Sequence, residues 1–318
     1  MVAVITINYN LSVHTVECVD SVLASDYNEL SVFLVDNGSE EDDYQTLAIH
    51  YHDNGRVRLL RIEKNCGYVK GINHGITEAS RINPDYFLIL NNDTLIDKPA
   101  ISFLVDAAVR HENKAIVSGK VLYYDQPDII QHTGVIFSDR RYFLTTYPGR
   151  NEKDTGQCDT ETERDSLDDV FWLLPAQVVK ETGLYCEQFF LYAEQGDYAL
   201  RAAGKGFKLL YTPKARIWHK ESLTAGKDKL QSPSVQFLRA QGRYVFQHRN
   251  MKGKYFYPHV FSNVVRYMGR ILFFGGRKRR LAIANLRGYL SGMRLMMLGK
   301  SNDGFNPYAS TKNRGEKK

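Results

Sequence analysis

Residues 85–94, DYFLILNNDT, decide the fold, because a run of apolar residues stops abruptly at a polar group. A short, continuous apolar run predicts a strand buried on both faces, which is typical of a parallel sheet. Four similar segments are VAVITIN (2–8), LSVFLVD (30–36), VRLLRI (57–62) and KAIVSGKV (114–121). Helical patterns fit between the strands at about 13–25, 41–52, 68–80 and 98–112. Crossovers of this length predict an α/β fold with a mainly parallel sheet covered by helices on both faces.

Polar side chains follow three of these strands at the point where each strand ends. The clusters are Asn8-Tyr9-Asn10, Asp36-Asn37-Gly38-Ser39 and Asn91-Asn92-Asp93-Thr94. Ligands of open parallel sheets bind beyond the carboxyl ends of the strands. We therefore expect the three clusters to line one crevice.

The second part of the chain changes pattern after residue 121. Strand-like pieces are predicted at 134–139, 141–147, 207–211 and 215–219, and helices at about 175–182 and up to Gly204. The polar stretch 150–165 has the composition of a mobile loop. From about residue 232 onward the pattern is helical. We expect a main domain over 1–230, a basic amphipathic helical extension over 231–300 and a disordered tail over 301–318.

Length and composition exclude several classes of protein. The chain has 318 residues, of which 43% are hydrophobic and 25% charged, as in folded proteins rather than disordered or fibrous ones. Its four cysteines form no CxxC pair, which argues against a disulfide framework or a zinc knuckle. The start, MVAVITINYN, lacks the features of a signal peptide, and no apolar stretch reaches 18 residues. We expect a cytoplasmic protein without a membrane-spanning helix.

The net charge of +6 conceals a strong asymmetry along the chain. Residues 239–318 hold 18 Lys and Arg against 2 Asp and Glu, so the rest of the chain is acidic. Arg280, Arg287 and Arg294 recur at seven-residue spacing among apolar residues, which predicts a helix with a cationic face. A helix of this kind typically binds an anionic membrane surface. We expect residues 239–300 to bind the inner face of the cell membrane in this way. No base-binding module of a nucleic-acid-binding protein is present, so we expect no nucleic-acid partner.

The segment Asn65-Cys66-Gly67-Tyr68-Val69-Lys70-Gly71-Ile72-Asn73-His74-Gly75 spaces glycines at intervals of four as it enters a predicted helix. Glycines let a ligand approach the backbone, and a helix N-terminus favours an anion such as diphosphate. Tight packing of the helix on the sheet is an equally good explanation. The segment fits neither GxGxxG nor the Walker pattern, so dinucleotide and ATP sites lose their usual support.

Four further residues carry candidate chemistry. Asp93, flanked by amides at a strand end, suits a divalent cation that borrows ligands from a diphosphate, although a turn-capping role is the simpler alternative. Glu194 and Asp197 lie three residues apart at a helix start, where one could serve as a general base. The alternative is an acidic first turn in which Asp197 pairs with Arg201. His219 is the last residue of a predicted strand. It is either a metal ligand or a histidine of the hydrophobic core.

Taken together and in order, these motifs resemble glycosyltransferase family 2, in its rhamnosyltransferase-like group with the GT-A fold. The resemblance covers roughly residues 2–250. Its motifs are ITINYN, VDNGS, NxGYxxGxNxG, NNDT, GLYxExFFLYAExxDxxLR, YxPxAxxWHKES and RYxFxxRN. It implies a nucleotide-sugar half over about 1–122 and an acceptor half over about 123–230.

The resemblance implies an enzyme, a hexosyltransferase that moves a sugar from a nucleotide-diphosphate donor to an acceptor hydroxyl with inversion. The donor expected is dTDP-rhamnose, with UDP-hexoses as the alternative, and the acceptor a glycan or lipid-linked saccharide of cell-surface polysaccharide synthesis. Donor-binding positions implied by the resemblance are Asn8, Tyr9, Asp36, Asn65, Gly67, Gly71, Asn73, Asn92 and Asp93. Asp93 and His219 would hold Mg²⁺ or Mn²⁺, which stabilises the leaving diphosphate.

One departure from the family pattern affects the base. Gln195 stands where related sequences carry an acidic residue, so Glu194 or Asp197 must take the proton. A catalytically silent nucleotide-sugar-binding partner at the membrane is the alternative function. A nucleotidyltransferase ranks last, because the N-terminal segment ITINYNLSVHT has no Lys or Arg to grip a triphosphate.

Overall fold

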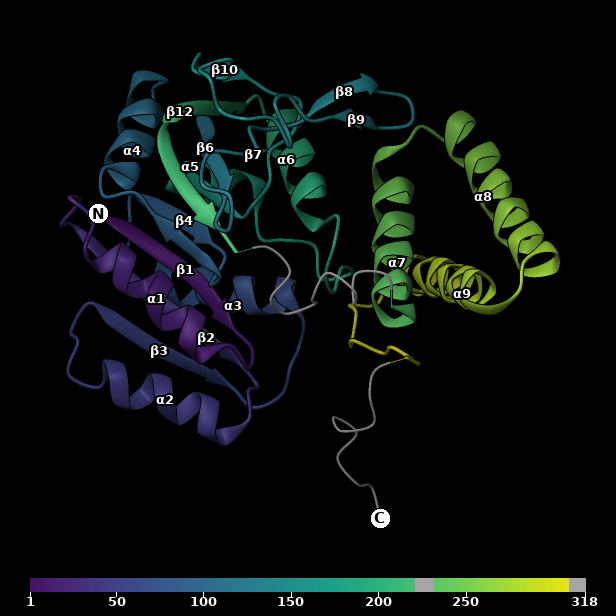
Figure 1. The fold of residues 1–318 in the computed structure, drawn as a ribbon, viewed down its shortest axis with the longest axis horizontal. Coiled ribbons are helices and arrows are strands. Elements are labelled where there is room, and N and C mark those ends of the chain that lie inside the picture. The colour runs from purple at the N-terminus through teal and green to yellow at the C-terminus, as the bar shows by residue number, and fades with distance from the viewer. Residues whose placement is uncertain (221–231, 309–318) are drawn as a thin grey trace. The chain divides into compact units, whose positions relative to one another are not determined.

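The computed structural model describes residues 1–220 and 232–308 (Figure 1). The chain divides into two compact units. Unit 1 comprises Met1–Tyr185 and Gln195–Leu223, and unit 2 comprises Cys186–Glu194 and Thr224–Lys318. A short internal segment therefore belongs with the C-terminal helices, whereas the sequence predicted contiguous parts with boundaries near residues 230 and 300.

Unit 1 is built on one ten-stranded mixed sheet. Its main strand order is β10-β12-β6-β11-β4-β1-β2-β3, with β5 paired to β12 and β7 paired to β6. The strands are β1 (Val2–Asn8), β2 (Leu30–Asn37), β3 (Val57–Ile62), β4 (Tyr86–Leu90), β5 (Thr94–Ile96), β6 (Ala115–Tyr123), β7 (Ile130–His132), β10 (Thr162–Glu163), β11 (Phe171–Pro175) and β12 (Lys208–His219). A separate two-stranded sheet pairs β8 (Ile136–Asp139) with β9 (Leu144–Thr146).

The predicted parallel sheet is confirmed in β3-β2-β1-β4, where every pairing is parallel. In this register Asn8 at the end of β1 lies beside Asp36 in β2, so two of the polar clusters meet. β11 runs antiparallel between β4 and β6. The apolar run FWLLP carries no signal of strand direction, which is why the sequence predicted no antiparallel strand here.

Helices cover the sheet on both faces. They are α1 (Ser12–Leu23), α2 (Glu41–Tyr51), α3 (Tyr68–Ser80), α4 (Ala100–Arg110), α5 (Ala176–Thr182) and α6 (Glu194–Gly204). α1 and α4 contribute Cys18 and Leu104 to one buried core with Val4 of β1. α3 packs against β1 and β2 through Gly75, where an added Cβ would lie 2.5 Å from Ile5 Cγ2. Small residues thus bring α3 close to the sheet.

β12 is one long strand where the sequence predicted two short ones. It pairs in parallel with β6, and the register shifts between Tyr211 and Arg216. Its end pairs antiparallel with β5, which the sequence analysis did not predict, and His219 is the register partner of Thr94. This pairing brings His219 next to Asp93.

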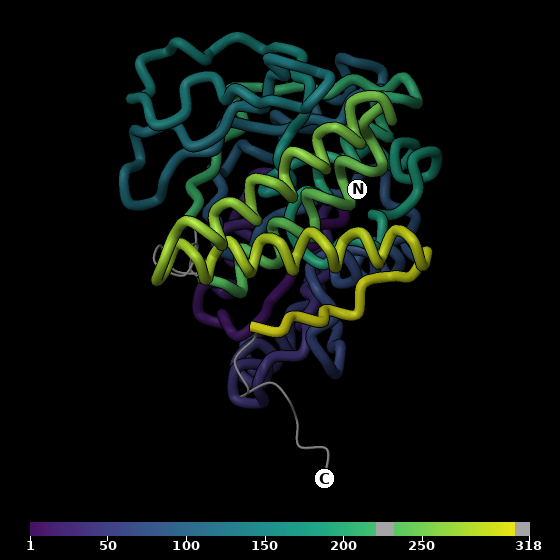
Figure 2. The backbone as a smooth tube through the Cα atoms, turned by 90° about the vertical axis from the view of Figure 1, so that its right-hand side faces the viewer, coloured from purple at the N-terminus to yellow at the C-terminus, as the bar shows by residue number. Residues whose placement is uncertain are grey.

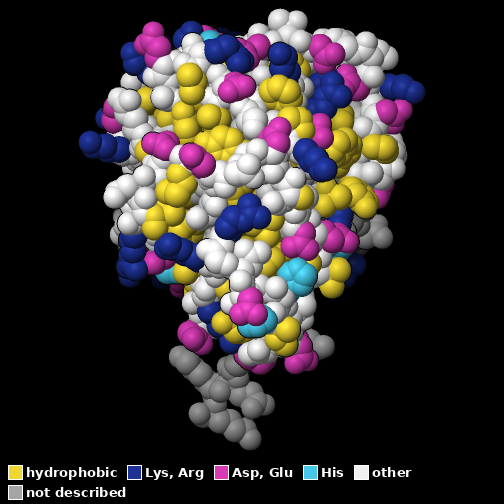
Figure 3. Space-filling model, turned by 90° about the vertical axis from the view of Figure 1, so that its left-hand side faces the viewer, with side chains coloured by type: hydrophobic (Ala, Val, Ile, Leu, Met, Phe, Trp, Pro, Cys, Tyr) yellow, Lys and Arg dark blue, Asp and Glu magenta, His cyan; other side chains and the backbone are white. Residues whose placement is uncertain are grey.

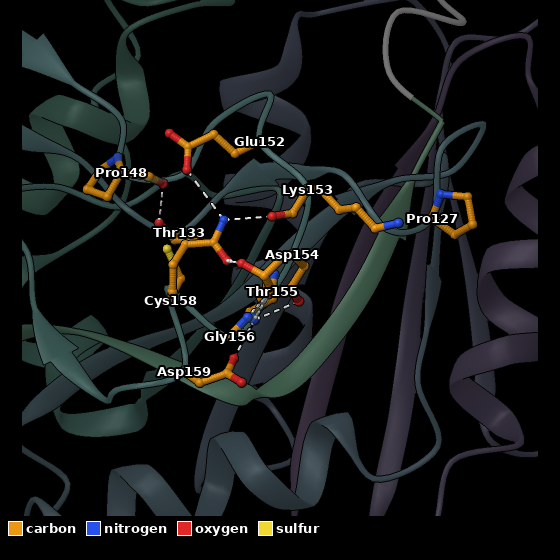
Figure 4. Close-up of polar contacts among 12 residues, drawn as sticks. Pro127, Thr133, Pro148, Glu152, Lys153, Asp154, Thr155, Gly156, Cys158 and Asp159 are labelled. Atoms are coloured by element: carbon orange, nitrogen blue, oxygen red, sulfur yellow. Dashed lines mark hydrogen bonds and ion pairs between the residues drawn. The ribbon is translucent and has the colours of Figure 1, made fainter.

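The stretch 150–165 was predicted to be a mobile loop, but its first part is held by hydrogen bonds (Figure 4). Gln157 bridges its own loop, donating from Nε2 to the Lys153 carbonyl at 2.7 Å and accepting from Thr155 N at 2.8 Å. Lys120 of β6, fully buried, donates from Nζ to Asp154 at 2.8 Å and to Asp159 at 2.5 Å. A buried cation therefore anchors the loop to the sheet.

Replacing Lys120 with Met should destabilise the protein by about 3–5 kcal/mol, because it leaves Asp154 without its counter-ion in a largely buried position. Burial tends to raise the pKa of Asp154, but hydrogen bonds from Lys120 outweigh it and lower that pKa. The stabilisation is present above the unfolded pKa and is lost as pH falls through the lowered folded pKa. Urea unfolding should therefore show a difference between the two proteins that shrinks in acid.

The matched control is Lys153→Met in the same loop. Lys153 pairs with Asp128 at 3.1 Å, but both side chains are more than half exposed. Exposed pairs contribute little to stability. A control variant as unstable as Lys120→Met would contradict a specific role for the buried ammonium.

The helices of unit 2 within residues 232–308 are α7 (Pro233–Asn250), α8 (Gly253–Phe273) and α9 (Gly276–Leu298). α7 and α9 approach closely, since a Cβ at Gly288 would lie 2.1 Å from the Phe237 carbonyl oxygen. Gln247 of α7 accepts a hydrogen bond from the Tyr289 hydroxyl of α9 at 2.9 Å. Figure 2 shows α8 and α9 joined at one end by a short turn and diverging from it. Across residues 1–220 and 232–308, no helix has the length and apolarity needed to cross a membrane.

Two segments outside these helices are fixed within unit 2. Asn302, 2% exposed, donates its backbone N–H to the Glu187 carbonyl at 2.7 Å and its side-chain amide to Gln241 at 2.8 Å. A Cβ at Gly304 would lie 2.4 Å from the ring of Phe190. The expectation of disorder from residue 301 is therefore wrong for 301–308, because buried polar groups there find partners. The remainder of that tail, 309–318, lies outside the described residues.

Candidate active site

Asn8 is the centre of a buried polar cluster at the end of β1. Its Nδ2 lies 3.0 Å from Asp36 Oδ1, 3.0 Å from Ser39 Oγ and 2.7 Å from Asp43 Oδ2. Its Oδ1 accepts a hydrogen bond from Thr15 Oγ1 at 2.8 Å. One amide thus joins the ends of β1 and β2 to the first turns of α1 and α2.

Asp36 is fully buried beside Asn8, and Tyr9, the residue that follows Asn8, is half-buried. The second carboxylate oxygen of Asp36 accepts from the Ser39 N–H at 3.2 Å. These bonds orient Asp36 and close the turn after β2. The three predicted nucleoside-binding positions, Asn8, Tyr9 and Asp36, therefore lie together at the carboxyl ends of neighbouring strands.

Asn37, which the sequence analysis included only as part of a polar cluster, clamps the turn that begins α3. Its Oδ1 accepts from Cys66 N at 3.1 Å, and its Nδ2 donates to the Gly67 carbonyl at 3.2 Å. Gly67 donates its N–H to Asn65 Oδ1 at 2.9 Å and has a φ of 89°, a conformation that favours glycine. The predicted positions Asn65 and Gly67 are thus held at the N-terminus of a 13-residue helix.

The structure shows packing and hydrogen-bonding roles for Gly71 and Asn73. A Cβ at Gly71 would lie 2.8 Å from Ile7 Cδ1, so this glycine faces the sheet and serves helix packing. Asn73 donates to the Tyr185 carbonyl at 3.0 Å and accepts from its N–H at 2.9 Å. Both ends of its amide bond to the backbone of Tyr185, and they fix the segment after α5.

Asp93 and His219 meet, although they are far apart in the sequence. His219 Nε2 lies 3.1 Å from Asp93 Oδ1, and His219 Nδ1 lies 2.7 Å from Gln131 Oε1. All three residues are at most 9% exposed. The backbone fixes the contact, because the Lys220 N–H donates to the Asp93 carbonyl at 2.9 Å.

His219 lies between two polar side chains, Gln131 at its Nδ1 and Asp93 at its Nε2. The Asp93 carboxylate can accept a hydrogen bond from an Nε2–H, or it can bind a metal cation together with an unprotonated Nε2. Metal-binding histidines commonly donate their other N–H to an oxygen acceptor.

Asp93 and His219 fit a divalent cation only if its other ligands come from elsewhere. No group of three or more His, Cys, Asp or Glu side chains that could hold a metal occurs in the described part of the chain. Mg²⁺ is usually bound by one or two carboxylates together with substrate phosphates and water. The two protein ligands therefore suit a cation that arrives with a diphosphate.

Thr15 and Lys220, which the sequence analysis did not select, complete this end of the sheet. Thr15 Oγ1 accepts from Asn92 Nδ2 at 2.7 Å and so connects Asn92 to Asn8. Lys220 Nζ lies 3.2 Å from His14 Nδ1, and burial lowers the pKa of Lys220. The sequence indicates Thr15 only as a polar residue on the inner face of a predicted helix.

The two carboxylates of α6 have different surroundings. Asp197, 1% exposed, accepts from Arg201 Nε at 3.0 Å, and Arg201 also donates to the carbonyls of Thr182 and Leu184. The predicted alternative, an Asp197–Arg201 pair, is therefore observed. Glu194, 4% exposed, belongs to unit 2 and follows Tyr192 and Ala193, whose φ angles of 77° and 72° are rare for such residues.

Asp169 is a buried carboxyl group that the sequence analysis missed. It is 5% exposed and accepts from the Tyr185 hydroxyl at 3.2 Å. Burial, reinforced by the neighbouring Asp168, raises the pKa of Asp169 to about 8. A pair of acidic residues directly before a buried apolar strand was the signal in the sequence.

Stability should fall between about pH 4 and pH 8 because of Asp169. The folded protein keeps this proton up to about pH 8, whereas the unfolded chain loses it near pH 3.8, so the folded state binds more protons in this range. The variant Asp169→Asn cannot ionise and should be the more stable protein at pH 8 while differing little at pH 4. Urea unfolding at both pH values measures this. A variant less stable than the wild type at pH 8 would contradict the raised pKa.

Known proteins resemble this chain in sequence and in fold. Residues 3–168 match the family model described as glycosyl transferase family 2. The chain belongs to glycosyltransferase family 2. The GT-A fold implied by its motifs is confirmed by a crystal structure of GalNAc-T7 with UDP, GalNAc and Mn²⁺, which superposes with a TM-score of 0.65 at 14% identity. That superposition covers 94% of this chain and 56% of GalNAc-T7.

Two relatives with known names are similar to this chain in sequence. The N-acetylglucosaminyl-diphospho-decaprenol L-rhamnosyltransferase of Mycobacterium tuberculosis is 24% identical over 242 residues, which is 71% of this chain and 78% of the relative. The glycosyltransferase GlyG of Streptococcus pneumoniae serotype 4 is 27% identical over 128 residues, 40% of this chain. The match spans 41% of the length of GlyG.

Proposed function

We propose that this protein is an inverting glycosyltransferase that moves a sugar from a nucleoside diphosphate to a hydroxyl of a glycan or lipid-linked acceptor. The observation that carries the proposal is the buried contact of Asp93 with His219, oriented by Gln131. Membership of glycosyltransferase family 2 and the name of the mycobacterial relative favour dTDP-rhamnose as donor, with UDP-hexoses as the alternative, and cell-surface polysaccharide synthesis as the process.

Donor recognition is proposed for residues at the ends of β1, β2 and β4 and at the start of α3. Asn8, Tyr9 and Asp36 would bind the nucleoside. Asn65 and Gly67 directly precede α3, and the backbone N–H groups of its first turn would face the diphosphate. Gly71 and Asn73 would support the site from the sheet side and from Tyr185, without touching the donor.

A divalent cation, Mg²⁺ or Mn²⁺, would be held by Asp93 and His219, with Asn92 beside it. When bound, such a cation stabilises negative charge on the leaving diphosphate. GalNAc-T7, which shares the fold, was crystallised with Mn²⁺, and this supports the choice of cation. Lys220 lies at the same end of the sheet, where its ammonium contacts His14 and pairs with Glu17.

For the base we propose Glu194. Gln195 cannot accept a proton, and Asp197 already pairs with Arg201. The left-handed backbone of Tyr192 and Ala193 directly before Glu194 is the kind of strain that accumulates at functional positions. The Glu194 carboxylate would take the proton of the acceptor hydroxyl as its oxygen attacks the anomeric carbon, and the nucleoside diphosphate leaves from the opposite face.

The test is a transfer assay with a panel of dTDP- and UDP-sugars, in Mg²⁺, Mn²⁺ or EDTA, read by mass spectrometry of product. We expect release of a nucleoside diphosphate from one donor class and none with EDTA. Full activity in EDTA would refute the metal-dependent proposal.

The alternative, a catalytically silent donor-binding protein, rests on Gln195. It predicts calorimetric binding of a nucleotide sugar with no consumption of the donor in the same sample. Release of product by the wild-type protein, lost in Glu194→Gln, excludes this alternative.

A further inference from the structure

α8 exposes an apolar face to solvent. Five of its side chains, which we call the α8 stripe, are between 45% and 73% exposed: Tyr257, Phe261, Val265, Met268 and Leu272. They follow one another at spacings of four, four, three and four residues, so they occupy an arc of about 80° on the helix. Phe273, 85% exposed, and Phe274, 45% exposed, continue the apolar surface into the turn before α9.

The α8 stripe is distinct from the face that α8 buries within unit 2. The buried residues of α8 are Phe256, Asn263 and Tyr267. Phe256 packs edge-to-face on Tyr244 of α7, and Asn263 donates to the Tyr289 hydroxyl of α9. The helix therefore has one apolar face for its own unit and a second one without a role in that core. A continuous exposed apolar surface of this kind marks an interaction site.

Charge around the α8 stripe identifies the partner. Residues 233–302 contain 14 Lys and Arg and no Asp or Glu. Four of these cations, which we call the basic cluster, are consecutive and exposed directly after the α8 stripe: Arg277, Lys278, Arg279 and Arg280. Among the residues that the structure describes, none of the four makes an ion pair, and Lys278 lies 5.3 Å from the centre of the Phe274 ring.

The basic cluster is unfavourable for α9 itself. It occupies the first turns of the helix, where the helix dipole already carries positive charge, and no acidic residue stands there. An anionic partner would relieve this repulsion. By contrast, the acidic and basic side chains on the side of the molecule shown in Figure 3 are interspersed.

We propose that unit 2 docks on an anionic lipid surface, with the α8 stripe among the acyl chains and the basic cluster on the lipid phosphates. An interfacial helix needs both an apolar face and flanking cations, and a bilayer surface offers both complements at once. A second copy of this chain would oppose two surfaces of the same positive sign. The inference is independent of the proposed transferase activity, since it concerns neither donor nor acceptor.

The experiment is sedimentation of the full chain with vesicles of phosphatidylcholine, with or without phosphatidylglycerol. We expect strong binding to the anionic vesicles only, and release at high salt. Two variants test the two parts of the surface separately. The double variant Phe261→Asp, Leu272→Asp removes the apolar contact. A second variant, with all four residues of the basic cluster replaced by Gln, removes the charge. Each should weaken binding by about tenfold or more.

The matched control is Ile49→Asp on α2, which changes an equally exposed apolar side chain, 70% accessible, in unit 1. It should bind vesicles like the wild type, and all variants should keep the wild-type unfolding temperature because the changed side chains are exposed. Absence of vesicle binding, or equal binding by the stripe variant, overturns the proposal. A concentration-dependent dimer that the Phe261→Asp, Leu272→Asp variant abolishes, without vesicle binding, would instead assign the surface to a second copy. Nucleic-acid binding without vesicle binding overturns it as well.

Discussion

Replacing Asp93 with Asn is expected to lower kcat for sugar transfer by about 1,000-fold or more, since the variant loses the only carboxylate of the proposed cation site. The fold should survive, because the new amide has the same shape and can donate a hydrogen bond to Nε2 of His219. Steady-state kinetics at saturating Mn²⁺ measures the first effect and thermal unfolding the second. Calorimetric titration of Mn²⁺ in the presence of the nucleoside diphosphate should show weaker binding, independently of activity.

The control for this prediction is Asp125→Asn, which removes an exposed carboxylate shortly after β6. It should leave both kcat and Mn²⁺ binding unchanged. If Asp93→Asn retains wild-type turnover, the contact with His219 is a structural hydrogen bond and the cation site lies elsewhere.

The second large effect is expected for Glu194→Gln, with kcat lower by about 100- to 10,000-fold, the range for loss of a general base. The substitution removes a proton acceptor while it keeps the size of the side chain. Unfolding temperature should stay near that of the wild type, and binding of the nucleotide sugar should persist.

Asp197→Asn is the matched comparison on the same helix. It breaks the ion pair with Arg201 at 3.0 Å, so its principal effect should be on stability. Urea unfolding and kcat together separate the two roles. A stable Asp197→Asn protein without activity, beside an active Glu194→Gln protein, would reverse the assignment of the base.

The strands and helices of the nucleotide-sugar half could be predicted from the sequence because hydrophobic periodicity fixes them locally. β1 and β3 have the predicted limits, and α3 begins and ends at the predicted residues. β5, with three residues, is too short to show a pattern. β12 extends through Thr212 and Pro213, where the sequence indicates a break, and the break corresponds to a register shift in the pairing with β6 between Tyr211 and Arg216.

The site could be predicted only in part. Motifs identified Asp93 and His219, but their contact depends on the register of β5 with β12, which no local pattern determines. Gln131 and Thr15 are single polar residues whose importance arises from burial beside other polar groups. Gly71 shows the opposite case, since packing on Ile7 explains a glycine that the motif alone assigned to the donor.

The segment Cys186–Glu194 has a consequence for the order in which the protein can form. It leaves the ribosome before α7, α8 and α9 exist, yet the carbonyls of Glu187 and Gln188 accept hydrogen bonds from Asn302, which follows all three helices. The carboxylate proposed as base ends this segment, so its final surroundings form only after residue 302 has been translated. A transcript cut short before codon 302 would yield a nascent chain whose N-terminal sheet can assemble while its catalytic machinery cannot.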